Sequence, residues 1–329
     1  MTLDESRLAA VRSAKLGALV ADLTGTPPDA QIQAASESAI VACLVGDRAF
    51  VLADAISDLG PAWHWFARQD AAMLTVLAES GVAEDLARRA SLVNADIEIM
   101  AVAAASARPA DVAPSPTVPE ISDELWRTAA VIADTGARVV DDNGRLTGEV
   151  RGLEVARVEP DDHALGSPRI QVGVGQADRE LHGYVHGHLD DQDRLRRAVE
   201  VVLQHRRAGA ALHPLTRLAR PRWIRSELLS NPAAIGLTDL EPQAPVRPTA
   251  GVFDREPATA YSRPDRVTVV CSAGVDLDLL PEAVDVRARI DPESRLILAL
   301  PSRDVALATG SLLESVPNSE VRAVTPPWE

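Results

Sequence analysis

Apolar residues in the first hundred positions alternate between helical spacing and short buried runs. Residues 3–23 place apolar side chains at helical intervals and acidic residues near the start, which predicts an amphipathic helix. Short apolar runs follow, separated by turn residues and by further helical patterns. The predicted strands cover 38–45, 49–53, 73–78 and 95–102, and the predicted helices cover 61–69 and 82–91. This alternation indicates a small α/β domain over residues 1–102.

A stretch with few large apolar residues comes next. Residues 103–120 are rich in alanine and proline, which predicts a linker. Beyond it, 122–135 predicts a helix with Ser122 as its N-cap, and 191–207 predicts a strongly amphipathic helix. Between these helices the predicted strands cover 137–140, 145–149, 153–159 and 170–175. The third region of the chain, residues 121–329, therefore begins with strands enclosed by two helices.

The C-terminal part alternates again after an irregular stretch. Residues 231–266 contain six prolines and little periodicity, which predicts a long loop. Strands at 267–272, 296–300 and 321–324 then alternate with helices near 279–286 and 305–316. This order predicts a βαβαβ unit with a parallel sheet. The fold expected for the whole chain is α/β, with mixed sheets flanked by helices.

The charge of the chain is unevenly distributed. The 329 residues fit two or three domains, and their net charge is −15. Such a charge argues against a protein that coats nucleic acid or an anionic membrane over its whole surface. Residues 191–230 alone reverse the sign, with nine arginines against four acids. Any contact with an anionic partner is therefore expected in this segment.

The cysteines and the N-terminus indicate a reducing compartment. Cys43 and Cys271 each lie alone in an apolar run, too few for a disulfide framework or a zinc cluster, and we expect two buried thiols. No stretch approaches the roughly 20 apolar residues of a membrane span. The start of the chain, MTLDESRLAAV, is acidic where a signal peptide would be basic. We therefore expect a cytoplasmic protein without a membrane partner.

Two predicted strands in the middle of the chain bring acidic residues close to one another. They read GEVRGLEVARVE, with Glu149 and Glu154, and RIQVGVGQADRE, with Asp178. With a helix on each side and a further strand available at 267, the order of elements resembles the restriction-endonuclease-like nucleases, the PD-(D/E)XK fold. The resemblance implies an αβββα core in which Glu149, Glu154 and Asp178 would hold Mg²⁺ or Mn²⁺ for phosphodiester hydrolysis.

The third strand departs from the nuclease pattern. Where an acid-x-lysine triplet is expected, the chain has Gly173-Val174-Gly175, and no lysine is near. Arg157 and Arg179 can take only the charge role, because arginine stays protonated and is a poor proton shuttle. The missing lysine favours a non-catalytic protein on a nuclease-like scaffold, for which no cofactor is expected.

Three phrases are similar to those of an actinobacterial protein family of unknown function. They are VGVGQADRE, HRRAGAALHPLTRLARPRWIRSEL and VVCSAGVDLDLLPEAVD. They span the middle and C-terminal regions. Because no activity is known for that family, the resemblance implies nothing about chemistry.

The basic segment is the first candidate contact surface. Its candidate binding residues are Arg206, Arg207, His213, Arg217, Arg220, Arg222, Trp223 and Arg225. Arginines with one tryptophan can grip phosphates and stack a base. Alternatively, these arginines pair with the many acids of the chain itself. The first hypothesis is thus a binding or assembly protein that contacts nucleic acid or an acidic protein, with its oligomeric state left open.

Two further groups have a functional and a structural interpretation. His182, His186 and His188 lie in HGYVHGH and would ligate a transition metal if the segment is extended, or lie in a solvated loop. Asp276 and Asp278 follow a predicted parallel strand, where α/β sheets bind ligands, or they begin the next helix. A metal-dependent nuclease with a displaced active site and a ligand-binding protein that uses the C-terminal unit are the alternatives to the first hypothesis.

Overall fold

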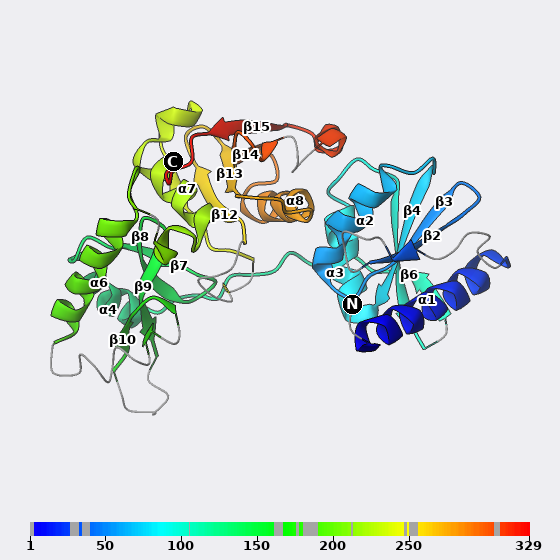
Figure 1. Ribbon diagram of the computed structural model, residues 1–329, viewed down its shortest axis with the longest axis horizontal. Coiled ribbons are helices and arrows are strands. Elements are labelled where there is room, and N and C mark those ends of the chain that lie inside the picture. The colour runs from blue at the N-terminus through cyan, green and yellow to red at the C-terminus, as the bar shows by residue number, and fades with distance from the viewer. Residues whose placement is uncertain are drawn as a thin grey trace. The chain divides into compact units, whose positions relative to one another are not determined.

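The α/β class with mixed sheets flanked by helices is confirmed by the computed structural model (Figure 1). The structure describes residues 3–26, 33–34, 40–104, 106–160, 167–175, 178–179, 190–211, 213–246, 249, 256–305 and 310–329. The chain divides into two compact units. Unit 1 comprises Met1–Ser115, Asp276–Arg289 and Ala306–Asn318, and unit 2 comprises Pro116–Val275, Ile290–Val305 and Ser319–Glu329. None of the described helices is both long enough and apolar enough to span a bilayer.

Unit 1 is built on a six-stranded mixed sheet with strands in chain order. The strands are β1 (Gln33–Ala34), β2 (Val41–Val45), β3 (Arg48–Leu52), β4 (Met73–Glu79), β5 (Ile97–Ala103) and β6 (Ser106–Pro109). Strands β3, β4 and β5 are parallel, and the outer pairs are antiparallel. Gly46 and Asp47 form the turn between β2 and β3. Strand β6 lies inside the predicted linker, so the stretch without helix or strand runs only from 110 to 122.

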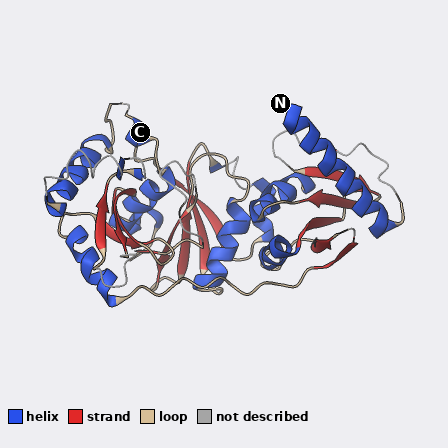
Figure 2. Cartoon of the chain, turned by 90° about the horizontal axis from the view of Figure 1, so that it is seen from below, coloured by secondary structure: helices blue, strands red, loops and turns tan. Residues whose placement is uncertain are grey.

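Helices cover both faces of this sheet. They are α1 (Leu3–Thr24), α2 (Leu59–Phe66) and α3 (Ser80–Ala90). One core joins Leu16 and Val20 of α1 to buried residues of β2, β3, β4 and β5, including Cys43. Figure 2 shows α1 lying along the sheet. The opposite core joins Leu59 of α2 and Leu86 of α3 to the other face, as expected when strand side chains alternate.

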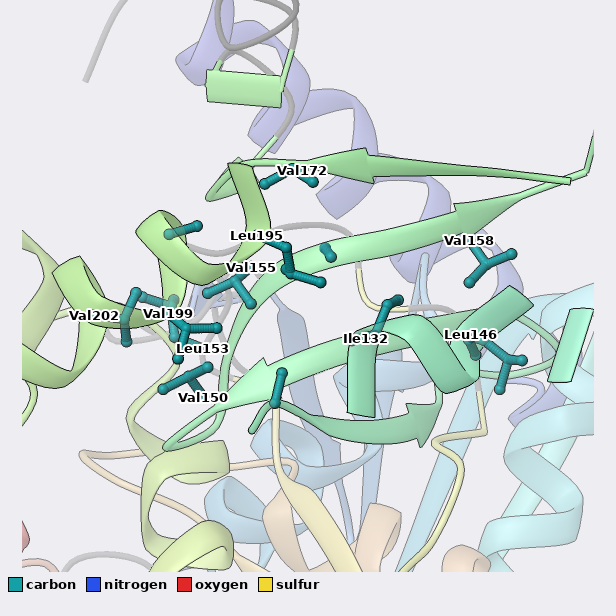
Figure 3. Close-up of a cluster of buried hydrophobic side chains, with 14 of the residues drawn as sticks. Ile132, Leu146, Val150, Leu153, Val155, Val158, Val172, Leu195, Val199 and Val202 are labelled. Carbon is teal, nitrogen blue, oxygen red and sulfur yellow. The ribbon is translucent and has the colours of Figure 1, made fainter. Parts of the chain in front are cut away.

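The middle of the chain, in unit 2, forms a four-stranded antiparallel meander. Its strands are β7 (Arg138–Asp141), β8 (Leu146–Val150), β9 (Leu153–Glu159) and β10 (Arg169–Val172). Helices α4 (Asp123–Ala133) and α6 (Asp191–His205) pack together on one face. Figure 3 shows Ile132 of α4 and Leu195, Val199 and Val202 of α6 with the apolar side chains of the strands. Ser122 caps α4 as predicted, because its hydroxyl accepts a hydrogen bond from the backbone N–H of Leu125.

The second sheet of unit 2 contains the predicted parallel strands. Its order is β11 (Glu241–Pro242), β12 (Ala258–Ser262), β13 (Val267–Cys271), β14 (Arg295–Pro301) and β15 (Ser319–Val324). Strands β13, β14 and β15 are parallel, as predicted, and α8 (Leu279–Ile290) connects the first two. Of the helix predicted at 305–316, the structure describes the 3₁₀ helix Gly310–Ser315, and residues 306–309 lie outside the described residues. Cys271 is buried in β13, and burial raises its pKa to about 12.

Two sequence-based expectations for this region were wrong. The strand beginning at Val267 does not extend the middle sheet, because it pairs with β12 and β14 in the other sheet. The region predicted as a long loop contains β11 and β12, because its alternating segment Ala258–Ser262 pairs antiparallel with β13. Pro242 is tolerated in β11 because this strand lies at the edge of the sheet.

Candidate functional site

The β8–β9 hairpin places the two predicted glutamates side by side. A register shift at Gly148 and Glu149 makes Glu149 the direct partner of Glu154. A Cβ at Gly148 would lie 2.4 Å from Ile132 of α4, so residue 148 faces the helices. Its neighbour Glu149 therefore points to the opposite face of the sheet. Leu153 belongs to the core beneath the helices, so Glu154 also points away from them.

Glu149 is neutralised by α7 (Arg220–Ser230), a helix that was not predicted from the sequence. Arg225 Nη2 donates to both carboxylate oxygens of Glu149, at 2.8 and 2.7 Å, and Arg222 Nη1 lies 3.7 Å from Oε1. All three side chains are buried. Burial alone would raise the pKa of Glu149, but Arg225 and Arg222 hold it below its usual value. The glutamate therefore stays ionised.

The tip of the β8–β9 hairpin positions α7. Arg151 and Gly152 form a two-residue turn with φ of 48° and 73°, the left-handed pair that suits the twist of a hairpin. A Cβ at Gly152 would lie 2.2 Å from the carbonyl carbon of Arg222. The hairpin therefore contacts the first turn of α7 backbone to backbone. Arg222 and Arg225 are three residues apart, on one face of the helix, and both reach Glu149.

Arg206 supports the same region from the end of α6. Its guanidinium donates to the carbonyl oxygens of Arg151, Leu215, Leu218 and Ala219. Its Cζ lies 4.2 Å from the ring centroid of Trp223. Burial, together with the nearby Arg222, lowers the pKa of Arg206 to about 9. This side chain joins the hairpin, the segment after α6 and the start of α7.

Glu154 has its own arginine partners. Arg157 and Arg179 lie 3.0 and 2.7 Å from its Oε1. The third predicted catalytic acid, Asp178, instead accepts a hydrogen bond from the backbone N–H of Val174 at 2.7 Å. Because the two glutamates are occupied by guanidinium groups, this donor set does not fit Mg²⁺ or Mn²⁺. Within the described ranges, no group of three potential metal ligands occurs.

A small hollow opens beside the Glu149 pair, and all of its lining residues lie in unit 2. Its cavity volume is about 20 Å³, room for one or two water molecules. The charged lining residues are Asp141, Asp142, Glu149, Arg222, Arg225 and Glu256. Thr249 donates to Asp142 through its backbone N–H at 3.1 Å and its hydroxyl at 2.7 Å. The acidic lining residues come from the end of β7 and the turn after it, from β8 and from the segment before β12.

The two guanidinium groups in the hollow have few partners. Arg222 is 8% exposed, and its guanidinium group makes no hydrogen bond with any residue that the structure describes. Arg225 is 3% exposed, and its Nε is buried without a hydrogen-bond partner in the same part of the chain. Each guanidinium carries five N–H donors. One carboxylate, that of Glu149, is shared between them.

The sequence-based view of the basic segment as an outward surface needs correction. Trp223 is fully buried and packs against Trp328, with ring centroids 5.9 Å apart, so it is not placed to stack on a base. Arg206, Arg222 and Arg225 are also buried, because they make internal contacts. Pairing with the acids of the chain itself, the alternative interpretation, holds for Arg222 and Arg225, which lie at Glu149, whereas Arg206 donates to backbone carbonyl oxygens.

The rest of the segment is more accessible. Arg207 and Arg217 are exposed, and Arg207 donates to the carbonyl of Gln204. Arg220 is half-buried over the ring of Trp328, at 4.6 Å. His213 stacks on His205, with ring centroids 3.7 Å apart.

The histidine cluster and the aspartate pair have different outcomes. His182, His186 and His188 lie outside the described residues. Asp276 and Asp278 lie immediately before α8, and Asp276 accepts a hydrogen bond from the backbone N–H of Asp278. The Asp278 carboxylate is buried in unit 1 and accepts from Gly60 N at 3.2 Å and from Arg89 Nη1 at 2.6 Å.

Comparison of the chain with protein-family models, with curated proteins and with solved structures found no significant match.

Proposed function

We propose that the chain is a non-catalytic binding protein and that the hollow in unit 2 binds a small anion. The observation that carries the proposal is the pair of buried guanidinium groups, Arg222 and Arg225, that share the single carboxylate of Glu149. This keeps the contact within the basic segment and assigns it to the two arginines that line a hollow.

The energetic argument rests on burial. Arg225 Nε is a buried donor without a hydrogen-bond acceptor among the described residues, and such a donor is costly because it loses the water that solvates it outside the protein. Arg222 has its nearest carboxylate oxygen at 3.7 Å, beyond hydrogen-bond distance. An anion in the hollow would accept from both arginines, and such charge-assisted bonds are about twice as strong as neutral ones.

The glutamates support a non-catalytic role. A metal-dependent nuclease needs carboxylates that are available to Mg²⁺ or Mn²⁺. Glu149 and Glu154 are instead each held by arginines, and the lysine of the nuclease pattern is missing. Internal ion pairs thus stand where the nuclease resemblance places metal ligands.

Small-anion binding is tested by titration calorimetry with acetate, chloride and inorganic phosphate at low ionic strength. Wild-type protein should bind at least one of them, and Arg222→Gln should weaken that binding at least tenfold. Because the guanidinium group of Arg222 makes no hydrogen bond with the described residues, this variant should keep its fold. Arg196→Gln, which alters an exposed arginine of α6, is the matched control. Equal affinity in both variants would refute the site.

A metal-dependent nuclease is the second candidate, favoured by the direct pairing of Glu149 with Glu154 across the hairpin. Plasmid DNA incubated with the protein and Mg²⁺ or Mn²⁺ should stay intact if the protein is non-catalytic. Cleavage that Glu154→Gln abolishes would replace our proposal with this one.

Contact with nucleic acid through the exposed arginines of the segment is a separate proposal. Arg207 and Arg217 carry it, because both side chains are exposed. Fluorescence anisotropy with a labelled duplex and a labelled single strand at low salt tests it. Phosphate contacts should give an affinity that falls with salt and that drops in Arg207→Gln/Arg217→Gln. No binding of either strand at low salt removes this proposal.

A further inference from the structure

The second sheet of unit 2 ends in a strand that has no described strand on its outer side. This strand is β15, which pairs only with β14 among the strands that the structure describes. Figure 1 shows it at the end of its sheet. Along its outer side, residues 320–324 present backbone N–H and C=O groups at the spacing of a β-ladder. Such an edge is a template for pairing with a further strand.

The other described sheet edges are short or contain proline, and β15 does not share these features. Strands β1 and β11 have two residues each, and β6, β7 and β10 have four. Pro109 lies in β6 and Pro242 in β11, and proline lacks the N–H that a partner strand needs. Short strands and prolines are common protections of an edge against pairing. With six residues and no proline, β15 is the described edge best suited to bind another strand.

The charges on β15 make its edge complementary to itself. Glu320 and Arg322 are two residues apart, so their side chains lie on the same face of the strand. Arg322 Nη2 donates to Glu320 Oε1 at 3.1 Å, and Arg295 Nη1 of β14 lies 3.1 Å from the same oxygen. The Arg322 side chain is still 48% exposed. Because a guanidinium group carries five N–H donors, Arg322 can bind a second carboxylate beside that of Glu320.

We infer that β15 pairs antiparallel with β15 of a second copy of the chain, with Val321 on the two-fold axis. In this register Glu320 lies opposite the partner's Arg322, and Arg322 lies opposite the partner's Glu320. The four side chains form a square in which neighbours always carry opposite charges, and opposite charges in directly facing positions stabilise a sheet. Because a two-fold contact uses the same edge of both copies, the assembly closes as a dimer.

Sedimentation velocity of the full chain at micromolar concentrations and low ionic strength measures this association. Wild type should show a concentration-dependent equilibrium between monomer and dimer. Arg322→Glu places four carboxylates in the square and should weaken the dimer at least tenfold. Arg196→Glu, which reverses the charge of an exposed arginine on α6, is the matched control and should leave the dimer unchanged. Wild-type protein that stays monomeric, or a dimer that Arg322→Glu leaves unchanged, overturns the inference.

A mixture of two variants tests whether charge complementarity causes the association. Arg322→Glu carries two acids on β15 and Glu320→Arg carries two arginines, so neither should pair well with its own copy. Together they place an acid opposite an arginine at both positions, and the mixture should form a heterodimer with an affinity within a fewfold of wild type. Circular dichroism and thermal unfolding check that each variant keeps its fold. Two folded variants that do not associate with each other contradict the proposed pairing.

Cysteine substitutions test the register of the two strands. On the two-fold axis the Cα atoms of Val321 and its copy are about 5 Å apart, within reach of a disulfide. Val321→Cys should therefore form a disulfide-linked dimer on mild oxidation with diamide. Ala323→Cys lies about 13 Å from its own copy and should not, although both variants retain the buried Cys43 and Cys271. Equally fast cross-linking of the two variants would overturn the two-fold axis at Val321.

Discussion

The guanidinium group of Arg206 donates hydrogen bonds to several backbone carbonyl oxygens. The four carbonyl oxygens that it reaches belong to three different segments of unit 2. In the sequence it looks like the residue that closes α6 and complements the helix dipole. Its hydrogen bonds to the hairpin and to the start of α7 could not be predicted from the sequence, because only the fold brings these segments together.

Replacing Arg206 with lysine tests this role. Lysine keeps the positive charge but reaches fewer carbonyls, and each buried carbonyl left unpaired costs about 1–3 kcal/mol. We expect Arg206→Lys to lower the free energy of unfolding by at least about 2 kcal/mol. Urea unfolding followed by tryptophan fluorescence measures it. The neighbouring exposed substitution Arg207→Lys should change stability by less than about 0.5 kcal/mol.

Asp278 provides a pH-dependent prediction in unit 1. Burial raises the pKa of Asp278 to about 6, from 3.8 for an exposed aspartate, although Arg89 lowers it. Burial lowers the pKa of Arg89, but Asp278, Glu282 and Asp285 raise it above its usual value. The shift of Arg89 therefore favours the charged ion pair, whereas the shift of Asp278 disfavours it. Of the two groups in this pair, Asp278 is the one that titrates between pH 4 and pH 7, so it determines the pair's contribution to the pH dependence.

The folded state binds the Asp278 proton more tightly than the unfolded state. Its contribution to stability is therefore full below about pH 4 and is lost as the pH rises through 6. The loss is about 2–3 kcal/mol by the size of the shift. Unfolding of wild type and Asp278→Asn between pH 4 and 7.5 measures it. The advantage of wild type should shrink as the pH rises, and a constant difference would contradict the assignment.

At the scale of single elements, the hairpin β8–β9 sets the position of α7. Gly46 and Gly152 both have positive φ, but only Gly152 has backbone atoms where a Cβ would be. Gly46→Ala should lower the free energy of unfolding by about 1 kcal/mol, because alanine disfavours the left-handed conformation. Gly152→Ala must also displace α7, and we expect about 3 kcal/mol or more.

The same pair of variants tests how the hollow is positioned. Because α7 carries Arg222 and Arg225, Gly152→Ala should also weaken ligand binding, whereas Gly46→Ala should not. Denaturant unfolding and calorimetry give the two quantities. If both variants lower the free energy of unfolding equally, the close contact between the hairpin and α7 does not contribute to stability.

The sequence predicts elements well where one face alone is apolar. The helices α1, α4 and α6, the strands β7, β8 and β9, and the parallel strands β13 and β14 follow from periodicity and caps. Helix α7 could not be found this way, because Arg222 and Arg225 are buried on it beside Trp223 and interrupt the pattern of apolar positions. The short edge strands β1, β6 and β11 also lack a signal, because their pairing depends on neighbours distant in sequence.

The candidate site was predictable in part. Glu149, Glu154 and the arginines were named from the sequence, because paired carboxylates and a basic segment stand out in an acidic chain. Asp142, Thr249 and Glu256 were not, because they come from three segments that only the fold brings together. Which arginines are buried was also beyond the sequence, since periodicity does not identify internal ion pairs.

At the scale of the whole molecule, unit 1 is completed by residues from far along the chain. Arg88 donates to Asp285 at 2.8 and 3.1 Å, and Arg89 to Asp278 and Asp285. The expected division at 102 and 120 placed these aspartates in a different region. A fragment of residues 1–115 contains both arginines and neither aspartate.

This arrangement predicts that one double substitution changes the free energy of unfolding in opposite directions in the full chain and in the fragment. In the full chain, Arg88→Gln/Arg89→Gln leaves Asp278 and Asp285 buried without their partners and should cost about 3–5 kcal/mol. In the isolated 1–115 fragment the same substitutions remove positive charges that have lost those partners, and they should be neutral or stabilising. Urea unfolding of the four proteins tests this. A similar cost in both contexts would contradict the contribution of the α8 carboxylates.

The pairing of α3 with α8 also bears on how the protein is made. A nascent chain leaves the ribosome from its N-terminus, so the sheet of unit 1 emerges well before residues 276–318. During that interval Arg88 and Arg89 have no aspartates from α8 to bind, and the surface that α8 will cover stays open to chaperones or to other chains. Translation stalled before residue 276 would hold the protein at this stage.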